Sequence, residues 1–278
     1  NVAVGRTAGA ANTIGARNTF LGGSNNVGNG AANTEGDDNT FVGNDTGGVN
    51  TTGNQNTAVG SDALDANTTA SNNTAIGFTS LGANTTGCYN TAIGAQAMED
   101  NTTGKDNVAI GKQTLTDNTT GDMTVAVGVN ALYTNTTGGC NTAIGFNTLC
   151  LNTTGAMNVA VGEKALDANT TASNNTAVGV DSLSGNTTGA GNIAVGCGAL
   201  CKNTTASGNI GIGREAGISI TTGACNTFIG ENVASNTTTA NYNTVMGAIA
   251  LLANSTGAEN TAIGGQALKC NTTGGQNT

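Results

Sequence analysis

The residues of this chain that could carry chemistry are asparagines in a recurring Asn-Thr-Thr triplet. An Asn followed two places later by Thr or Ser is an acceptor sequence for N-glycosylation. The candidate acceptors are Asn50, Asn67, Asn84, Asn101, Asn118, Asn135, Asn152, Asn169, Asn186, Asn203, Asn254 and Asn271. The triplet also fits a turn ladder in which each Asn amide bonds its counterpart one repeat away. One side-chain amide cannot both carry a glycan and bond its counterpart in the next repeat, and we favour the ladder.

Other chemistry has little support in the sequence. The chain has no His, which excludes Ser-His and Cys-His pairs. Its carboxylates do not recur in phase, as a calcium-binding repeat would require. The string from Gly211 to Ala216 resembles a dinucleotide fingerprint but lacks a βαβ context. We predict no catalytic residue, no cofactor, no metal site and no enzyme activity.

The seven cysteines do not form an obvious disulfide framework. None shares a repeat position with a Cys in the adjacent repeat, so no bridge between stacked neighbours is expected. Cys197 and Cys201 could pair only if the segment between them were a helical turn. We expect free thiols, with links between subunits as the alternative.

These residues are set in a repeat of 17 residues that an Asn opens, as at Asn39, Asn56 and Asn73. We number positions within the repeat from this Asn, and Thr124 replaces it once without changing the phase. The commonest repeat reads N-T-A-I/V-G-x-x-A-L-x-x-N-T-T-G-x-x. The period predicts that residues 1–278 form one array of about 16 coils.

The repeat predicts strands rather than helix. A Gly at position 5 of every repeat would disrupt a long helix, whereas the β-branched residues before it favour a short strand that ends in a bend. We therefore predict an all-β fold, a parallel β-solenoid of 17-residue coils. Positions 6 to 11 could be a turn, a helical turn or a second short strand.

Strand alternation suggests which side chains point inward. We expect the aliphatic residue at position 4 and the Leu at position 9 to fill the interior. The Ala at position 3 would then face outward, where an apolar residue needs cover. This outward Ala and the small amount of Val, Ile, Leu and Phe predict an oligomer, for which a trimer is the simplest closed form.

Two stretches depart from the pattern. Coils within residues 1–55 lack the central Leu, and residues 23–38 contain a four-residue insertion that should form a loop. Residues 217–240 form the second irregular stretch, in which Ile220 replaces the expected Asn and Asn236 comes one place early. These are the positions where we expect a kink or a specific contact.

Composition narrows the partners and the setting. Seventeen acidic against eight basic residues give a net charge of −9, which argues against nucleic acid binding. No apolar run is long enough to span a membrane. The chain begins at Asn1 and ends in the same phase of the repeat, as expected for a segment of a longer array.

The strings N-T-A-I-G and N-V-A-V-G resemble the head repeats of trimeric autotransporter adhesins, and related strings those of trimeric phage tail fibres. The repeat here is longer than the usual adhesin head repeat. The resemblance implies a left-handed parallel β-roll, a homotrimer, surface display and adhesion.

We expect a non-enzymatic structural segment of an extracellular or cell-surface fibre, present as a homotrimer or an end-to-end filament. The first alternative is an adhesin or phage-type receptor-binding fibre that contacts glycans or a protein on a host surface. The second is an ice-binding solenoid, although adjacent Thr side chains in a strand would leave only one column facing outward.

Overall fold

A computed structural model describes residues 1–23 and 28–278 of the chain. Residues 24–27, within the predicted insertion, lie outside the described residues. The chain divides into two compact units, Asn1–Cys140 and Asn141–Thr278.

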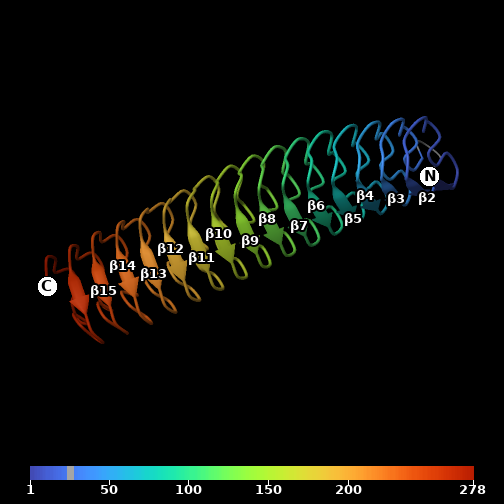
Figure 1. The fold of residues 1–278 in the computed structure, drawn as a ribbon. Coiled ribbons are helices and arrows are strands. Elements are labelled where there is room, and N and C mark those ends of the chain that lie inside the picture. Colours follow the sequence, from blue (N-terminus) through green and yellow to red (C-terminus); the bar gives the residue numbers. More distant parts are fainter. Residues whose placement is uncertain (24–27) are drawn as a thin grey trace. The chain divides into compact units, whose positions relative to one another are not determined.

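Each unit is a stack of three-residue strands, one per coil (Figure 1). The strands of the first unit are β1 (Val2–Val4), β2 (Thr19–Leu21), β3 (Thr40–Val42), β4 (Thr57–Val59), β5 (Thr74–Ile76), β6 (Thr91–Ile93), β7 (Val108–Ile110) and β8 (Val125–Val127). The strands of the second unit are β9 (Thr142–Ile144), β10 (Val159–Val161), β11 (Thr176–Val178), β12 (Ile193–Val195), β13 (Ile210–Ile212), β14 (Thr227–Ile229), β15 (Thr244–Met246) and β16 (Thr261–Ile263). The described residues contain no helix.

Neighbouring strands within each unit pair in parallel and in register. Thr57 lies beside Thr74, and Ala58 beside Ala75. The same register continues in the second unit, where Val159 lies beside Thr176. Equivalent positions are therefore stacked from coil to coil, which confirms the parallel β-solenoid with a 17-residue spacing.

The segment at positions 6 to 11 is a run of turns, neither a second strand nor a helical turn. Its backbone enters the left-handed region at position 7 and again at position 9, as at Asp62 (φ 56°) and Leu64 (φ 55°). Position 17 has the same conformation, for example Gln55 (φ 58°). These reversals turn the chain sharply enough to close a coil in 17 residues.

The glycine at position 5 is required by both backbone conformation and space. Gly111 has φ 138°, and a Cβ there would lie 2.7 Å from the carbonyl oxygen of Gly128 in the next coil. The same backbone oxygen would obstruct any side chain, because equivalent coils stack directly on each other. This explains why the position never varies.

The predicted orientation of positions 3 and 4 is wrong. Ala58 and Ala75 at position 3 are fully buried, whereas Val59 and Ile76 at position 4 are 37% and 38% exposed. The physical reason is the narrow interior. A Cβ added at Gly211, in position 3, would lie 2.7 Å from Leu200 Cγ of the preceding coil, so a Leu at position 9 leaves room there only for a small residue.

The predicted Leu column at position 9 is confirmed. Leu64, Leu81, Leu115, Leu132, Leu149, Leu166, Leu183, Leu200 and Leu251 are fully buried. Leu268 is half-buried. Each of these side chains fills the interior beside the small residue at position 3.

Where this Leu is missing, a Phe at position 3 of the same coil or of the next one fills the space. Phe228 is buried, and a Cβ at Gly217 would lie 2.5 Å from its ring. Phe41 fills the space beside Gly47 in the same way, and Phe20 and Phe41 stack with ring centroids 5.7 Å apart. The two irregular stretches therefore preserve interior volume by exchanging a Leu and an Ala for a Gly and a Phe.

The four-residue insertion leaves the ladders on both sides aligned. Asn33 donates its amide to Asn12 Oδ1, and the backbone nitrogen of Asn39 donates to Asn18 Oδ1, both across 21 residues instead of 17. The extra residues are accommodated before position 12, so the coil rejoins the stack in phase.

Candidate functional site

The Asn-Thr-Thr turns form a regular polar ladder along each unit. At position 12, Asn101 Nδ2 donates to Asn84 Oδ1 (2.8 Å) and to the carbonyl oxygen of Gly104 (3.0 Å). Asn118 repeats this arrangement by donating to Asn101 Oδ1 (2.8 Å). Each amide therefore links its own turn to the coil before it, as the ladder interpretation predicts.

A second Asn ladder runs along position 1. The backbone nitrogen of Asn73 donates to Asn56 Oδ1 (3.0 Å), while Asn56 Nδ2 donates to the carbonyl oxygen of Ala70 (2.9 Å). Asn67 Nδ2 donates to the same carbonyl (3.1 Å), so the asparagines at positions 1 and 12 of one coil share the acceptor at position 15. Thr124 replaces the Asn in one coil, where its backbone nitrogen still donates to Asn107 Oδ1 (2.9 Å).

The two threonines of the triplet have different surroundings. Thr102 at position 13 is partly buried, and its hydroxyl donates to the carbonyl oxygen of Thr119 (2.9 Å). Thr103 at position 14 is exposed. Of the two threonines in the triplet, only the one at position 14 therefore forms an exposed column.

The predicted glycosylation acceptors lie inside the ladder. All of them are fully buried except Asn271, which is partly exposed. Their burial and their hydrogen bonds favour the ladder, because a glycan on Asn101 would replace one of the two N–H groups that its amide donates and would have to fit at a fully buried position. Glycosylation itself stays a prediction.

The position-12 ladder changes at two coils in the second unit. Ile220 and Thr237 occupy the position there and are fully buried. Asn254 Nδ2 reaches Thr237 Oγ1 at 3.5 Å, a weak contact. Asn236, which precedes Thr237, is exposed, so the Asn that comes one place early in the sequence lies outside the ladder.

Attention to the Asn-Thr-Thr triplet alone missed other acceptor sequences. Asn44 begins Asn-Asp-Thr and Asn174 begins Asn-Asn-Thr, and both side chains are exposed. Asn72, in Asn-Asn-Thr, is partly exposed. A search for every Asn-x-Thr would have found them, but only the structure separates these exposed residues from the buried ones.

The outward side of the strands carries a second surface, which we call the strand-face stripe. It consists of the position-4 residues Val4, Leu21, Val42, Val59, Ile76, Ile93, Ile110, Val127, Ile144, Val161, Val178, Val195, Ile212, Ile229, Met246 and Ile263. Ile93 and Ile110 are 37% and 38% exposed in the first unit, and Ile212 is 38% exposed in the second. The position-2 side chains lie beside the stripe on the same face of the strands.

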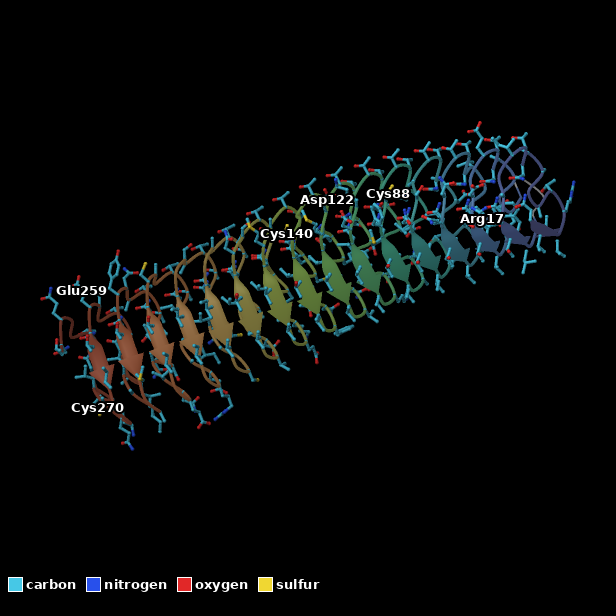
Figure 2. All side chains as sticks on the ribbon, in the orientation of Figure 1. Arg17, Cys88, Asp122, Cys140, Glu259 and Cys270 are labelled. Atoms are coloured by element: carbon cyan, nitrogen blue, oxygen red, sulfur yellow. The ribbon has the colours of Figure 1, made fainter. Side chains whose placement is uncertain are left out.

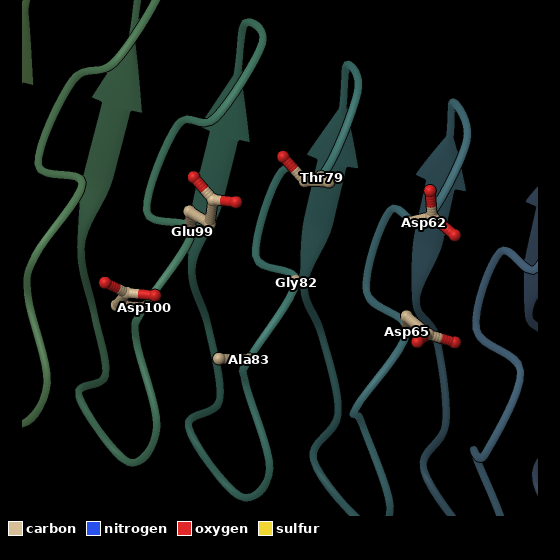
Figure 3. Close-up of a pocket in the computed structure, with 7 residues that line it drawn as sticks. All are labelled: Asp62, Asp65, Thr79, Gly82, Ala83, Glu99 and Asp100. Atoms are coloured by element: carbon tan, nitrogen blue, oxygen red, sulfur yellow. The ribbon is translucent and has the colours of Figure 1, made fainter.

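An acidic hollow of about 290 Å³ lies on the turn side of the first unit. Figure 3 shows its wall across three consecutive coils, with Asp62 and Asp65 on one coil and Glu99 and Asp100 two coils away. The coil between them contributes Gly82 and Ala83, whose small size opens the space.

The hollow has incompletely satisfied polar atoms. Asp65 Oδ1 and Thr79 Oγ1 are buried without a hydrogen-bond partner. Burial raises the pKa of Asp65, and the carboxylates of Asp62 and Asp45 raise it further. Among the described residues, no group of three or more His, Cys, Asp and Glu side chains has a geometry that could hold a metal ion.

The other charged groups and the thiols lie mainly on the loops. Arg214 pairs with Glu231 (2.6 Å) at the surface, and such exposed pairs contribute little to stability. Cys88 and Asp122, both at position 16, lie on loops of the first unit (Figure 2). None of the seven cysteines, all of which lie in the described residues, forms a disulfide. Burial raises the pKa of the Cys150 thiol.

Comparison of the chain with protein-family models, with curated proteins and with solved structures finds no match. The described residues include no helix with the length and apolar composition that crossing a membrane requires.

Proposed function

We propose that this chain is a non-enzymatic structural segment of an extracellular or cell-surface fibre. The observation that carries the proposal is the presence of side-chain ladders parallel to the backbone ladder. Asn at positions 1 and 12 and Thr at position 13 all bond the adjacent coil, as Asn73, Asn101 and Thr102 do. Separating two coils requires breaking these bonds together.

The distribution of side chains also fits a structural role. Buried asparagines bond within the molecule and present no amide to a ligand in solution. A ladder of buried, hydrogen-bonded amides adds rigidity because each unsatisfied amide would be costly. The resemblance of the repeat strings to adhesin heads and phage fibres points in the same direction.

Force spectroscopy tests this role. We expect the chain, pulled along the stacking direction, to resist extension and then to lose coils in steps of about 17 residues, because each coil contacts only its neighbours. A matched chain with Asn84, Asn101 and Asn118 changed to Ala should unfold at lower force. Extension of the unmodified chain at the low force of a flexible linker would contradict the proposal.

Receptor binding is the second candidate, and the exposed side chains at position 17 favour it. More than half of the side chain is exposed at each of Tyr89, Met123, Met157 and Tyr242. All four have a positive φ, whereas the residue type at position 17 changes from coil to coil. Tyr is among the residue types enriched where binding energy concentrates. A solid-phase screen against glycans and matrix proteins distinguishes the two roles, since a pure spacer should bind none.

A further inference from the structure

The last residue of the Asn-Thr-Thr triplet contributes no hydrogen bond of its side chain to the fold. Asn at position 12 and Thr at position 13 bond the adjacent coil, whereas the hydroxyls at position 14, such as those of Thr103 and Thr120, have no partner in the described residues. All of these side chains are exposed. We call them the threonine column, which extends from Thr52 to Thr137 in the first unit and from Thr154 to Thr273 in the second.

The backbone does not require a threonine at position 14. The first two coils have Ile14 and Glu35 there, and both side chains are exposed. The backbone nitrogens of Ile14, Glu35 and Thr52 all donate to the position-13 carbonyl of the next coil, at 3.2, 3.1 and 3.3 Å. The same local structure therefore forms around an aliphatic, an acidic and a hydroxyl side chain.

Position 14 is nevertheless Thr in all fourteen coils that follow the first two. In the same fourteen coils, position 16 has seven residue types and position 17 has eight. The constancy of position 14 is therefore not the result of repeats that have had no time to diverge. Ser would keep the hydroxyl and Val would keep the methyl and the shape, but neither occurs. The position requires the hydroxyl and the methyl together.

The glycosylation sequence does not explain this requirement. Thr at position 14 completes an Asn-x-Thr acceptor only where position 12 is Asn. Ile220 and Thr237 replace that Asn in two coils, yet Thr222 and Thr239 still occupy position 14. Since the Thr stays where the acceptor is lost, the requirement lies in the exposed side chain itself.

We propose that the threonine column binds the surface of ice. A methyl group is surrounded by a cage of hydrogen-bonded water, and a hydroxyl both donates and accepts hydrogen bonds, so Thr can join an ordered water lattice through both groups. Stacked strands place these groups at intervals of about 4.8 Å within each unit, close to the interval at which the lattice of ice repeats. A periodic ligand rewards identical side chains on successive coils, because its contacts add along the column.

The surroundings of the column suit this ligand. Positions 12 to 15 carry no charged residue in any of the fourteen coils, whereas the flanking positions 11 and 16 do, as at Asp117 and Lys105. Charged groups hold water of their own and are costly to strip of it. The sequence predicted that adjacent threonines in a strand would face opposite ways, but positions 13 and 14 lie in a bend. Thr102 is partly exposed beside Thr103, and its hydroxyl is held by the carbonyl oxygen of Thr119.

Thermal hysteresis, the gap between the melting and freezing points in the presence of an ice crystal, tests the proposal. We expect the unmodified chain to produce a gap and to shape the crystal. Thr103→Tyr/Thr120→Tyr should lose most of the gap, because the rings hold the ice away from the neighbouring threonines. The control Asp106→Tyr/Met123→Tyr adds the same rings to the same coils at position 17, where Tyr89 occurs naturally, and should keep the gap.

A milder variant keeps the test valid if the Tyr variant misfolds. Thr103→Val/Thr120→Val keeps the shape and the methyl groups and removes only the hydroxyls, so circular dichroism should show the unmodified β signal while the gap becomes smaller. An unmodified chain without a gap, or column variants with the gap of the control, would overturn the proposal. The fibre role is tested separately by force spectroscopy, because it depends on positions 1, 12 and 13 and not on position 14.

Discussion

At the scale of single residues, Asn101 shows what a ladder asparagine contributes. Asn101→Ala removes the donor to Asn84 Oδ1 and the acceptor of Asn118 Nδ2. Each buried polar atom that loses its partner costs about 1–3 kcal/mol, so we expect a fall of about 2–4 kcal/mol in the free energy of unfolding. Chemical denaturation followed by circular dichroism measures it.

The control for this substitution is Thr103→Ala, two residues away. Thr103 is exposed, and its truncation should change the free energy of unfolding by no more than about 0.5 kcal/mol. Equal losses in the two variants would show that the amide ladder contributes nothing beyond ordinary packing.

Glycan attachment offers a second residue-scale prediction. In a host that glycosylates secreted proteins, we expect sugar on the exposed Asn44, Asn174 and Asn236 and none on the buried Asn101 and Asn118. An amide that donates two buried hydrogen bonds is out of reach of a transferase once the coil has formed. Glycopeptide mass spectrometry locates the sites, and occupancy at Asn101 would show that modification precedes folding.

At the scale of elements, interior volume is shared between positions 3 and 9. Gly217→Leu should destabilise the chain strongly, because a Cβ at Gly217 already lies 2.5 Å from the Phe228 ring. Phe228→Ala alone should cost about 3–5 kcal/mol by leaving a cavity. The double variant restores the common Leu-Ala pair, so we expect it to recover most of the loss.

A double-mutant cycle from urea denaturation quantifies this exchange. We expect a coupling of at least about 2 kcal/mol between Gly217 and Phe228. Gly208→Leu, on an exposed loop of the preceding coil, is a control for adding a large side chain and should show no coupling with Phe228→Ala. Additive losses at Gly217 and Phe228 would contradict the shared-volume explanation.

The same pair of positions shows how far the sequence leads. The period, the parallel stacking and the buried Leu column could be predicted, because each depends on repetition alone. The orientation of Ala58 and Val59 could not, since shifting a three-residue strand by one place exchanges its faces. The prediction placed the larger side chain, Val59, in the interior, whereas the turns leave room there for the smaller one, Ala58.

The candidate sites were predictable to a similar degree. The Asn ladder follows from identical residues in identical phase, but the exposure of Asn236 depends on Thr237 taking the ladder position. The acidic hollow arises because Gly82 and Ala83 are small and lie between coils that carry Asp65 and Glu99. The sequence shows that Asp65, Gly82 and Glu99 follow one another at intervals of 17 residues, but it does not show that they line one hollow.

At the scale of the whole molecule, acidity should govern the pH dependence of stability. Burial is the main cause of the raised pKa values of Asp65, Asp117 and Asp167. A carboxylate whose pKa is higher in the folded state opposes folding when it is ionised, and this penalty is relieved as the pH falls through the raised pKa. Asp38 acts in the opposite direction, because its hydrogen bond to Arg17 lowers its pKa, but this pair lies at the exposed surface and contributes little.

We therefore expect the chain to become more stable as the pH falls from about 7 toward the ordinary Asp value near 4, where the gain ends. Reduction of the net charge of −9 adds to the effect by lessening self-repulsion. Thermal denaturation across this range measures it. Asp65→Asn should raise the stability at neutral pH and make the acid-induced rise smaller, and a steady loss of stability on acidification would contradict the assignment.

The ladders also bear on whether each of the two units can fold without the other. Hydrogen bonds between coils in the described residues join positions no more than 22 apart in the chain, so Asn1–Cys140 and Asn141–Thr278 each contain their own strands, Asn ladders and interior columns. Repeat arrays of this kind derive their stability from each repeat and its nearest neighbours.

We expect both halves, expressed separately, to fold with a β-type circular dichroism spectrum and to unfold cooperatively. The half 141–278 should be the less stable in denaturant, because Ile220 and Thr237 weaken its position-12 ladder, and Ile220→Asn should narrow the difference. If either half stayed unfolded under conditions in which the full chain folds, stability would have to come from contacts longer in range than those between adjacent coils.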